Sequence, residues 1–166
     1  MSTTLNAVPR TETAERLYQG LAALPASSRL SEAQLEALYG LGHSHLLQGQ
    51  PRQALPYFSL LGMYGMPRRH YLAGLALCLQ RCERYDDAVR VYALLGTLFP
   101  ETADPFVGMA ECLLAAGRRQ EAAQELDRVL RYLEADARQG GADAEQARIR
   151  AHVQALRALA VQDGSP

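Results

Sequence analysis

A period of 34 residues constrains the fold of this chain more than any other feature of its sequence. Ala54, Ala88 and Ala122 are 34 residues apart. Three further sets keep the same spacing: the small residues Gly42, Ala76 and Ala110, the large residues Phe58, Tyr92 and Leu126, and the apolar residues Leu41, Leu75 and Met109. A fixed period of this length indicates stacked repeats, each of which packs on its neighbours.

The turn residues predict that each repeat is a pair of helices. A period of this length is typical of the tetratricopeptide repeat, which is a helical hairpin. Gly49 and Gly117 lie two periods apart, and Glu83 holds the matching position between them. Glycine accepts the left-handed backbone conformation that closes a helix. We therefore expect paired helices at 32–48 and 52–64, at 69–82 and 85–98, and at 104–116 and 119–135.

Two of these helices begin at recognisable capping residues. Ser31 is followed three residues later by Gln34, which resembles a capping box at the start of repeat one. Asp104 precedes Pro105, so we expect the Asp104 carboxylate to cap a helix whose first residue is proline.

Apolar stripes on both sides of the repeats predict a flanking helix at each end. Leu17, Leu21 and Leu24 follow a helical spacing before the repeats. Ile149, Val153, Leu156 and Ala160 do so after the break at Gly140 and Gly141. The predicted fold is all-α: an N-terminal extension and helix in 1–30, three tandem tetratricopeptide hairpins in 31–135 (about 35–68, 69–102 and 103–136), and a C-terminal capping helix at 142–162.

The composition argues against nucleic acid or a membrane as a partner. The formal net charge of −1 creates no overall field that would attract either one. All 17 basic residues are arginine, which indicates a GC-rich bacterial genome. The first ten residues lack a basic start followed by an apolar stretch. We therefore expect a cytoplasmic protein with reduced cysteines.

The histidines do not form a recognisable metal-binding pattern. His43 and His45 are two residues apart, so on a helix they point to different sides. Adding His70 does not complete a ligand set. We interpret His43 as part of a binding face and expect no metal and no other cofactor.

The cysteines are better explained by packing than by chemistry. Cys78 and Cys82 have the spacing of two residues that could meet a metal ion. However, Cys78 and Cys112 occupy the same repeat position, and the small residue Ser44 is their counterpart in repeat one. No nucleophile, base and orienting acid converge by spacing, and the sequence has no Gly-rich phosphate loop. We therefore expect that the protein is not an enzyme.

One face of the first helix of each repeat predicts a binding groove. Tyr39, His43 and Leu46 fall at helical spacing on one face of repeat one. Ala73 and Leu77 continue this face in repeat two, and Val107, Glu111 and Leu114 continue it in repeat three. The alternative is that Tyr39 and Leu77 are ordinary core residues, because helix faces in a repeat stack are shared.

Three stretches resemble the class II chaperones of bacterial type III secretion. They are Leu35 to Gly42, Tyr71 to Cys78 and Ala110 to Leu114, within a resemblance that runs from about Ser31 to Leu133. The resemblance implies a cytoplasmic chaperone that keeps hydrophobic translocator proteins soluble before export. It also implies a concave groove that receives an extended translocator segment with a short Pro/Leu motif.

The resemblance extends to individual groove positions. Tyr39 and Tyr92 match the aromatic groove positions of this family, whereas His43, Leu46 and Val107 stand where relatives often carry larger aromatic residues. Together with the helix-face argument, this predicts a groove formed by Tyr39, His43, Leu46, Ala73, Leu77, Tyr92, Val107 and Glu111.

The N-terminal stripe predicts a homodimer when no client is bound. Leu17, Tyr18, Leu21 and Leu24 present more apolar surface than a short cap needs, and relatives often self-associate through this region. Two other functions stay open at this point. One is a scaffold or regulatory adaptor without an export client, and the other is a chaperone of secretion needle subunits, a class that is usually shorter.

Overall fold

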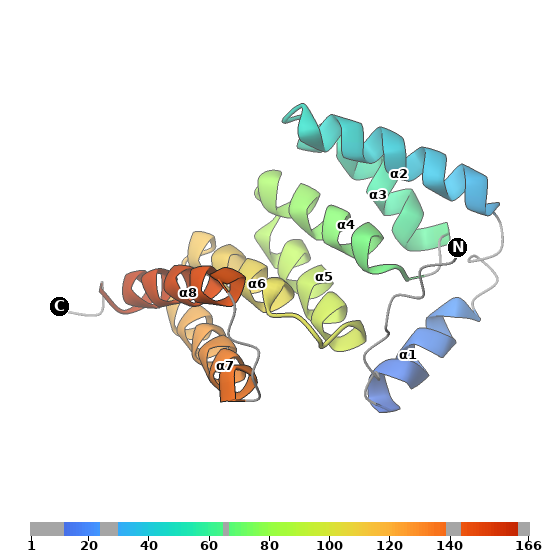
Figure 1. Cartoon of the computed structure of the whole chain (residues 1–166). Coiled ribbons are helices and arrows are strands. Elements are labelled where there is room, and N and C mark those ends of the chain that lie inside the picture. The colour runs from blue at the N-terminus through green and yellow to red at the C-terminus, as the bar shows by residue number, and fades with distance from the viewer. Residues whose placement is uncertain (1–11, 24–29, 65–66, 139–143, 163–166) are drawn as a thin grey trace.

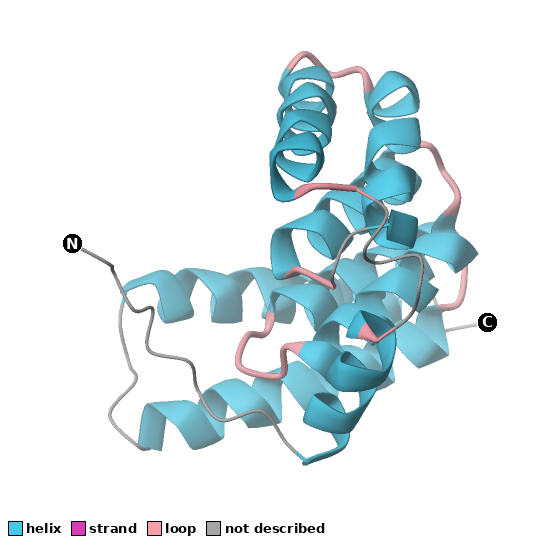
Figure 2. Cartoon of the chain, turned by 90° about the vertical axis from the view of Figure 1, so that its right-hand side faces the viewer, coloured by secondary structure: helices cyan, strands magenta, loops and turns pink. Residues whose placement is uncertain are grey.

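The computed structural model describes residues 12–23, 30–64, 67–138 and 144–162, and every regular element in these ranges is a helix (Figure 2). The helices are α1 (Glu12–Ala22), α2 (Glu32–Leu47), α3 (Pro51–Tyr64), α4 (Arg69–Arg81), α5 (Tyr85–Leu98), α6 (Asp104–Ala115), α7 (Arg119–Arg138) and α8 (Ala144–Gln162). The predicted all-α fold is confirmed. None of the described helices combines the length and apolar character that a membrane-spanning segment requires.

The helices form a layered array of hairpins (Figure 1). Each helix from α2 to α7 packs against the next one along the chain. The pair α2 and α3 stands at one end of the array, and α8 stands at the other end (Figure 1). Helix α1 lies against α5 instead of joining the stack beside α2. The C-terminal helix covers the last hairpin, because Val153 is buried in a core cluster with residues of α6 and α7.

The capping residues behave as expected at one helix start and differently at the other. The capping box of α2 is present: Gln34 N donates to Ser31 Oγ at 3.3 Å, and Ser31 N donates to Gln34 Oε1 at 2.8 Å. The prediction that Asp104 caps α6 is wrong by one residue, since Ala103 is the N-cap and offers no side-chain acceptor. Asp104 instead accepts a hydrogen bond from Arg69 at 3.1 Å, across the boundary between repeats two and three.

The hairpin turns adopt the predicted left-handed conformation. The φ angles of Gly49 and Gly117 are 69° and 76°, and Glu83 at the matching position has a φ of 61°. Glycine adopts this conformation without a steric penalty, whereas a side chain does not. The turn of repeat two therefore carries a backbone strain that the other two turns lack.

Neighbouring repeats meet where an aromatic ring lies against a glycine. A Cβ atom at Gly74 would lie 2.1 Å from Cε1 of Phe58, and one at Gly108 would lie 2.6 Å from Cζ of Tyr92. Both glycines are one period apart, and so are both rings. The second helix of each repeat thus inserts a ring against the first helix of the next. This glycine column is visible in the sequence, but its role follows from the structure.

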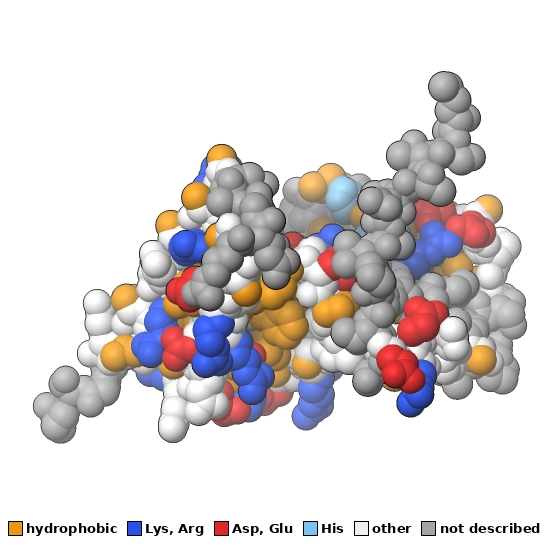
Figure 3. Space-filling model, turned by 60° about the horizontal axis from the view of Figure 1, so that its bottom comes forward, with side chains coloured by type: hydrophobic (Ala, Val, Ile, Leu, Met, Phe, Trp, Pro, Cys, Tyr) orange, Lys and Arg blue, Asp and Glu red, His pale blue; other side chains and the backbone are white. Residues whose placement is uncertain are grey.

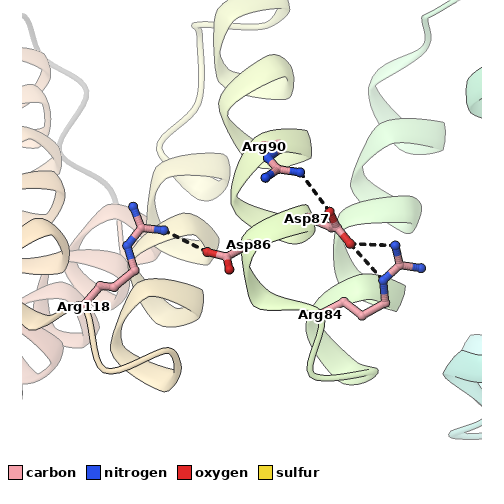
Figure 4. A network of polar contacts seen from close by, with 5 residues as sticks. All are labelled: Arg84, Asp86, Asp87, Arg90 and Arg118. Carbon is pink, nitrogen blue, oxygen red and sulfur yellow. Dashed lines mark hydrogen bonds and ion pairs between the residues drawn. The ribbon is translucent and has the colours of Figure 1, made fainter.

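Ion pairs repeat in register along the turn edge of the array. Arg84 donates to Asp87 at 2.6 Å, and Arg118, one period later, donates to Glu121 at 2.7 Å. Arg118 also reaches back to Asp86 at 3.0 Å and so joins two hairpins (Figure 4). These side chains are largely exposed, so salt screens the pairs. They help to set the relative positions of the turns rather than form a core.

Charged side chains of both signs mix on one face of the described residues (Figure 3). On the face drawn in Figure 3, Arg side chains alternate with Asp and Glu side chains around a hollow in which apolar side chains gather. This pattern agrees with the near-zero net charge of the chain.

Relief of the strain at Glu83 should stabilise the protein. We expect Glu83→Gly to raise the free energy of unfolding by about 0.5 to 1 kcal/mol. Glycine adopts the left-handed conformation at a lower cost, and this gain exceeds the opposing effect of the greater conformational entropy that glycine gives the unfolded chain. The melting temperature should rise by about 1 to 4 °C. Gly117→Ala is the opposite control and should lower the stability by about 1 kcal/mol. Thermal unfolding followed by circular dichroism measures both, and a lower melting temperature for Glu83→Gly would contradict the argument.

The contact between Phe58 and Gly74 should tolerate no added methyl group. We expect Gly74→Ala to lower the free energy of unfolding by about 1 to 3 kcal/mol, because the buried ring has to shift. Gly62→Ala is a matched control, since a Cβ there lies at an ordinary 3.5 Å from Leu75. This control should be neutral or stabilising by up to about 1 kcal/mol through helix propensity. Urea unfolding separates the two variants, and equal stabilities would contradict the ring-over-glycine contact.

Candidate functional site

Two adjoining clefts run along the first helices of repeats two and three. The apolar cleft has a volume of about 520 Å³ and is lined by Arg69, His70, Ala73, Leu77, Tyr92, Leu95, Asp104 and Pro105. The polar cleft has a volume of about 720 Å³ and is lined by Leu77, Gln80, Arg81, Tyr85, Tyr92, Asp104, Val107, Gly108, Glu111, Ala115, Arg148, Ile149 and His152. Three residues line both clefts, so the two form one continuous groove. They are Leu77, Tyr92 and Asp104.

Five of the eight predicted groove residues lie on these clefts. They are Ala73, Leu77, Tyr92, Val107 and Glu111. Leu77 is half-buried at the junction of the clefts, where an occupant of either cleft would contact it. Spacing on α4 and α6 therefore identified side chains that the structure brings together. The three predicted residues of α2 do not line either cleft.

Tyr39 and His43 form an aromatic cluster next to the apolar cleft. The Tyr39 ring stacks on His43 with 5.5 Å between the ring centroids, and it meets the edge of His70 at 4.8 Å. His70 lines the apolar cleft, so the cluster continues the groove towards α2. Tyr39 also contacts the buried rings of Phe58 and Tyr71, at 6.0 Å and 5.8 Å. One side of Tyr39 is thus part of the core, as the alternative interpretation held.

The predicted face does not continue to Leu46. This side chain is partly buried and packs against the core cluster of repeat one. Leu46 has the helical spacing from Tyr39 that the groove argument requires, but its side chain packs against the core cluster of α2, α3 and α4. Spacing alone cannot distinguish these two outcomes.

Tyr92 supports the groove more than it lines it. The Tyr92 side chain is 9% exposed, and its ring packs over Gly108. Its hydroxyl donates to Oε1 of Gln80 at 2.7 Å. Burial raises the pKa of Tyr92 well above its usual value, so the hydroxyl stays protonated and keeps donating.

A chain of hydrogen bonds crosses the polar cleft and ties four helices together. Gln80 on α4 accepts from Tyr92 on α5 and donates from Nε2 to Oε2 of Glu111 on α6 at 3.0 Å. The other Glu111 oxygen, Oε1, lies 2.9 Å from Nε2 of His152 on α8. Both carboxylate oxygens of Glu111 are therefore engaged within the protein. The chain fixes the polar wall of the groove in one arrangement.

Sequence reasoning missed Gln80 and His152. Gln80 lies at helical spacing from Ala73 and Leu77, so the same face argument extended by one turn would have included it. His152 comes from α8, which lies outside the repeat period, and no spacing signal connects it to Glu111.

Burial lowers the pKa of His70, which favours a neutral imidazole at the apolar cleft.

The described residues offer no metal site. No group of three or more His, Cys, Asp or Glu side chains in these ranges could hold a metal ion. Cys78 and Cys112 are completely buried, as their common repeat position predicts, and burial raises the pKa of both thiols to about 12. Buried protonated thiols are poor nucleophiles.

The N-terminal stripe is partly used inside the chain. Leu21 packs against the core of repeats two and three, whereas Leu17 is 37% exposed. Leu24 and the side chain of Tyr18 lie outside the described residues. Among the described residues of the stripe, Leu17 is therefore the exposed leucine, whereas Leu21 is packed within the chain.

The fold is similar to that of solved proteins of bacterial type III secretion. PcrH from Pseudomonas aeruginosa is 23% identical over 82% of this chain and 98% of its own, with a TM-score of 0.67. The Yersinia enterocolitica type III secretion chaperone SycD, in complex with a peptide of the translocator YopD, is 21% identical over 83% of this chain and 100% of its own, with a TM-score of 0.70. A chain in a T3SS complex from Aeromonas hydrophila is 21% identical over 89% of this chain and 94% of its own, with a TM-score of 0.72.

The TM-scores of 0.67 to 0.72 establish a shared fold, which agrees with the helical repeats predicted from the sequence. No protein-family model matches the chain, and no curated protein matches it either. The fold likeness covers most of each chain, so it concerns the whole array and not one hairpin.

The buried thiols should resist alkylation in the folded protein. We expect iodoacetamide at neutral pH to leave Cys78 and Cys112 unmodified, because both are buried and protonated. Half-buried Cys82 serves as the internal reference. In denaturant all three thiols should react. Peptide mapping by mass spectrometry measures each site, and labelling of native Cys112 as fast as Cys82 would contradict the packing role.

Proposed function

We propose that this protein is a bacterial cytoplasmic chaperone that binds hydrophobic translocator proteins of a type III secretion system and keeps them soluble. The observation that carries the proposal is the open groove of two adjoining clefts on this repeat array. It is supported by the fold likeness to SycD, solved with a peptide of the translocator YopD, and to PcrH, solved with the chaperone-binding regions of PopD and PopB. A chaperone of this kind is not an enzyme and needs no cofactor.

The dimensions of the groove suit an extended peptide segment. Volumes of about 520 Å³ and 720 Å³ are in the range of ligand pockets, and the two clefts adjoin at Leu77. An extended chain places successive side chains on opposite sides, so alternate residues can enter the clefts. The groove is preformed, so the chaperone loses little freedom on binding.

The two clefts differ in the chemistry that they offer. Ala73, Leu77, Leu95 and Pro105 give one cleft apolar walls, which suit the leucine or proline side chains of a hydrophobic client. The other cleft carries the Gln80 and Glu111 chain and suits polar groups of the client backbone. Tyr39 and His43 extend the apolar cleft with aromatic surface. In this proposal Tyr92 is a support beneath the groove and Leu46 belongs to the core.

A scaffold or regulatory adaptor is the competing function. The fold alone fits both functions, because repeat arrays bind many kinds of segments. Purification of the tagged protein from its native bacterium, followed by mass spectrometry of the bound chains, separates them. Recovery of secreted proteins with membrane-active segments supports the chaperone. Recovery of a soluble regulator alone would favour the adaptor.

Loss of apolar surface in the groove should weaken client binding. We expect Leu77→Ala to reduce the affinity for a fluorescent peptide from the recovered client by roughly 5- to 150-fold, or about 1 to 3 kcal/mol. Tyr39→Ala should have a similar effect. Leu60→Ala is the matched control, because Leu60 is 39% exposed on α3 and lines neither cleft. This variant should bind as the wild type does.

Circular dichroism of each variant separates binding from folding in this titration. Tyr39 contacts the core rings, so its variant can lose helicity, whereas Leu77 lies outside the buried core clusters. Equal affinity of the wild type and a fully helical Leu77→Ala variant would show that this groove is not the binding site.

A further inference from the structure

The polar cleft of the groove has one wall that the repeats do not supply. Arg148, Ile149 and His152 of α8 line this cleft together with residues of α4, α5 and α6. Helix α8 therefore contributes to the groove, in addition to its role as the cover of the last hairpin. The charged groups that an occupant meets here come from both the repeats and the flanking helix.

The acidic side chains of the polar cleft are already engaged within the protein. Asp104 accepts a hydrogen bond from Arg69 at 3.1 Å. Glu111 accepts from Gln80 at 3.0 Å and lies 2.9 Å from Nε2 of His152. Both carboxylates therefore have partners before any segment enters the groove. Among the described residues, the cleft holds no unpaired anion that would select a cationic residue of the client.

Arg81 is a cationic side chain of this cleft that has no partner in the described part of the chain. It is exposed at the end of α4, and it has neither a hydrogen bond nor an ion pair with any described residue. Its charge is favourable in the last turn of the helix, but that interaction leaves the guanidinium donors available. A guanidinium group presents a planar fork of N–H groups that matches a carboxylate. Arg148 adds a second positive charge to the same cleft.

Arg81 lies one helical turn beyond Leu77, the residue at which the two clefts meet. Side chains at this spacing on a helix are about 5 to 6 Å apart. An extended segment advances about 3.3 Å per residue, so it covers this distance in about two residues. When a client residue packs on Leu77, its neighbours about two residues away are therefore within reach of Arg81.

We propose that Arg81 pairs with the carboxylate of an Asp or Glu side chain of the client, about two residues from the apolar residue that packs on Leu77. The inference rests on the proposed function, because it concerns a segment bound in the same groove. The apolar cleft accepts many apolar segments, so it contributes affinity but little selection. The charge of Arg81 disfavours basic neighbours and favours acidic ones, and this allows the groove to distinguish between apolar segments.

A library of random linear peptides displayed on phage tests this selection without a known client. The peptides are joined to the coat protein by their carboxyl ends, so every carboxylate belongs to a side chain. The wild type should enrich sequences with an apolar residue and an Asp or Glu about two residues away. Arg81→Glu should enrich Lys or Arg at that position instead, because the sign of the charge is reversed.

Arg131→Glu is the matched control for this selection. Arg131 is exposed on α7 and lines neither cleft, so the variant changes the net charge equally and should select as the wild type does. Leu77→Ala should lose the enriched sequences, because the apolar residue no longer has its contact. Enrichment that is unaffected by Leu77→Ala would place the peptides elsewhere and overturn the inference.

The outcomes separate the inference from the proposed function. Enrichment of apolar residues without an acidic neighbour would overturn the inference and leave the proposed function standing. An acidic preference that persists in Arg81→Glu would have the same meaning. The absence of any enriched sequence would count against both.

Titration of one enriched peptide, amidated and fluorescent, measures the pair directly. We expect Arg81→Gln to weaken binding by roughly 5- to 20-fold at low salt, because a charge-assisted hydrogen bond is lost at a partly exposed site. Replacement of the acidic residue of the peptide by Gln should cause the same loss, and both changes together should cost little more than one. Losses that add in full would show that Arg81 does not pair with the acid and would overturn the inference.

Salt and a conservative variant distinguish an ion pair from a structural role of Arg81. The loss in Arg81→Gln should shrink as salt is added, whereas the loss in Leu77→Ala should not. Arg81→Lys keeps the charge and should bind more tightly than Arg81→Gln. Circular dichroism shows whether α4 keeps its helicity in each variant. Unchanged affinity of a fully helical Arg81→Gln variant would contradict the inference.

Discussion

The contact of an aromatic ring with a glycine determines how this array is built. Phe58 lies between two glycines: a Cβ at Gly42 of its own hairpin would come within 3.0 Å of the ring, and one at Gly74 of the next hairpin within 2.1 Å. The absence of side chains there lets three helices approach a single ring. Tyr92 repeats the contact at Gly108. The two rings set how closely neighbouring hairpins approach, and the Tyr92 ring does so at the groove.

The contact of Tyr92 with Gly108 also fixes the side chains that form the polar wall of the groove. The Tyr92 ring is fixed by Gly108, so its hydroxyl reaches Gln80 at 2.7 Å and continues through Glu111 to His152. A polar wall of the groove is thus positioned by a core residue. If the side chains of Gln80, Glu111 and His152 were mobile, binding would have to order them at a cost in entropy. Here their hydrogen bonds order them before any segment binds. Both carboxylate oxygens of Glu111 take part in these hydrogen bonds, so the polar wall has one arrangement before any segment enters the groove.

The helices could be predicted from the sequence because their signals are local. The period, the turn glycines and the capping box of Ser31 place five of the six repeat helices within one residue of their observed ends, and α7 extends three residues further, to Arg138. Groove residues on α4 and α6 could be predicted too. Leu46 could not be assigned, because the same spacing fits the core and the groove. His152 and the position of α1 lie outside the period, so they depend on tertiary packing that no short pattern records.

Tyr92 packs in the core over Gly108 and also lines the groove, and this limits which substitutions the groove can accept. A smaller side chain at this position would alter the groove, but it would also leave a void over Gly108 and loosen two hairpins at once. Leu77 has no such second role, since it lines the groove and lies outside the buried core clusters. Substitutions at the rim can therefore change the shape of the groove, while Tyr92 keeps its floor in place. When the rim and the floor of a groove are separate residues in this way, the rim can change in sequence while the architecture of the array persists.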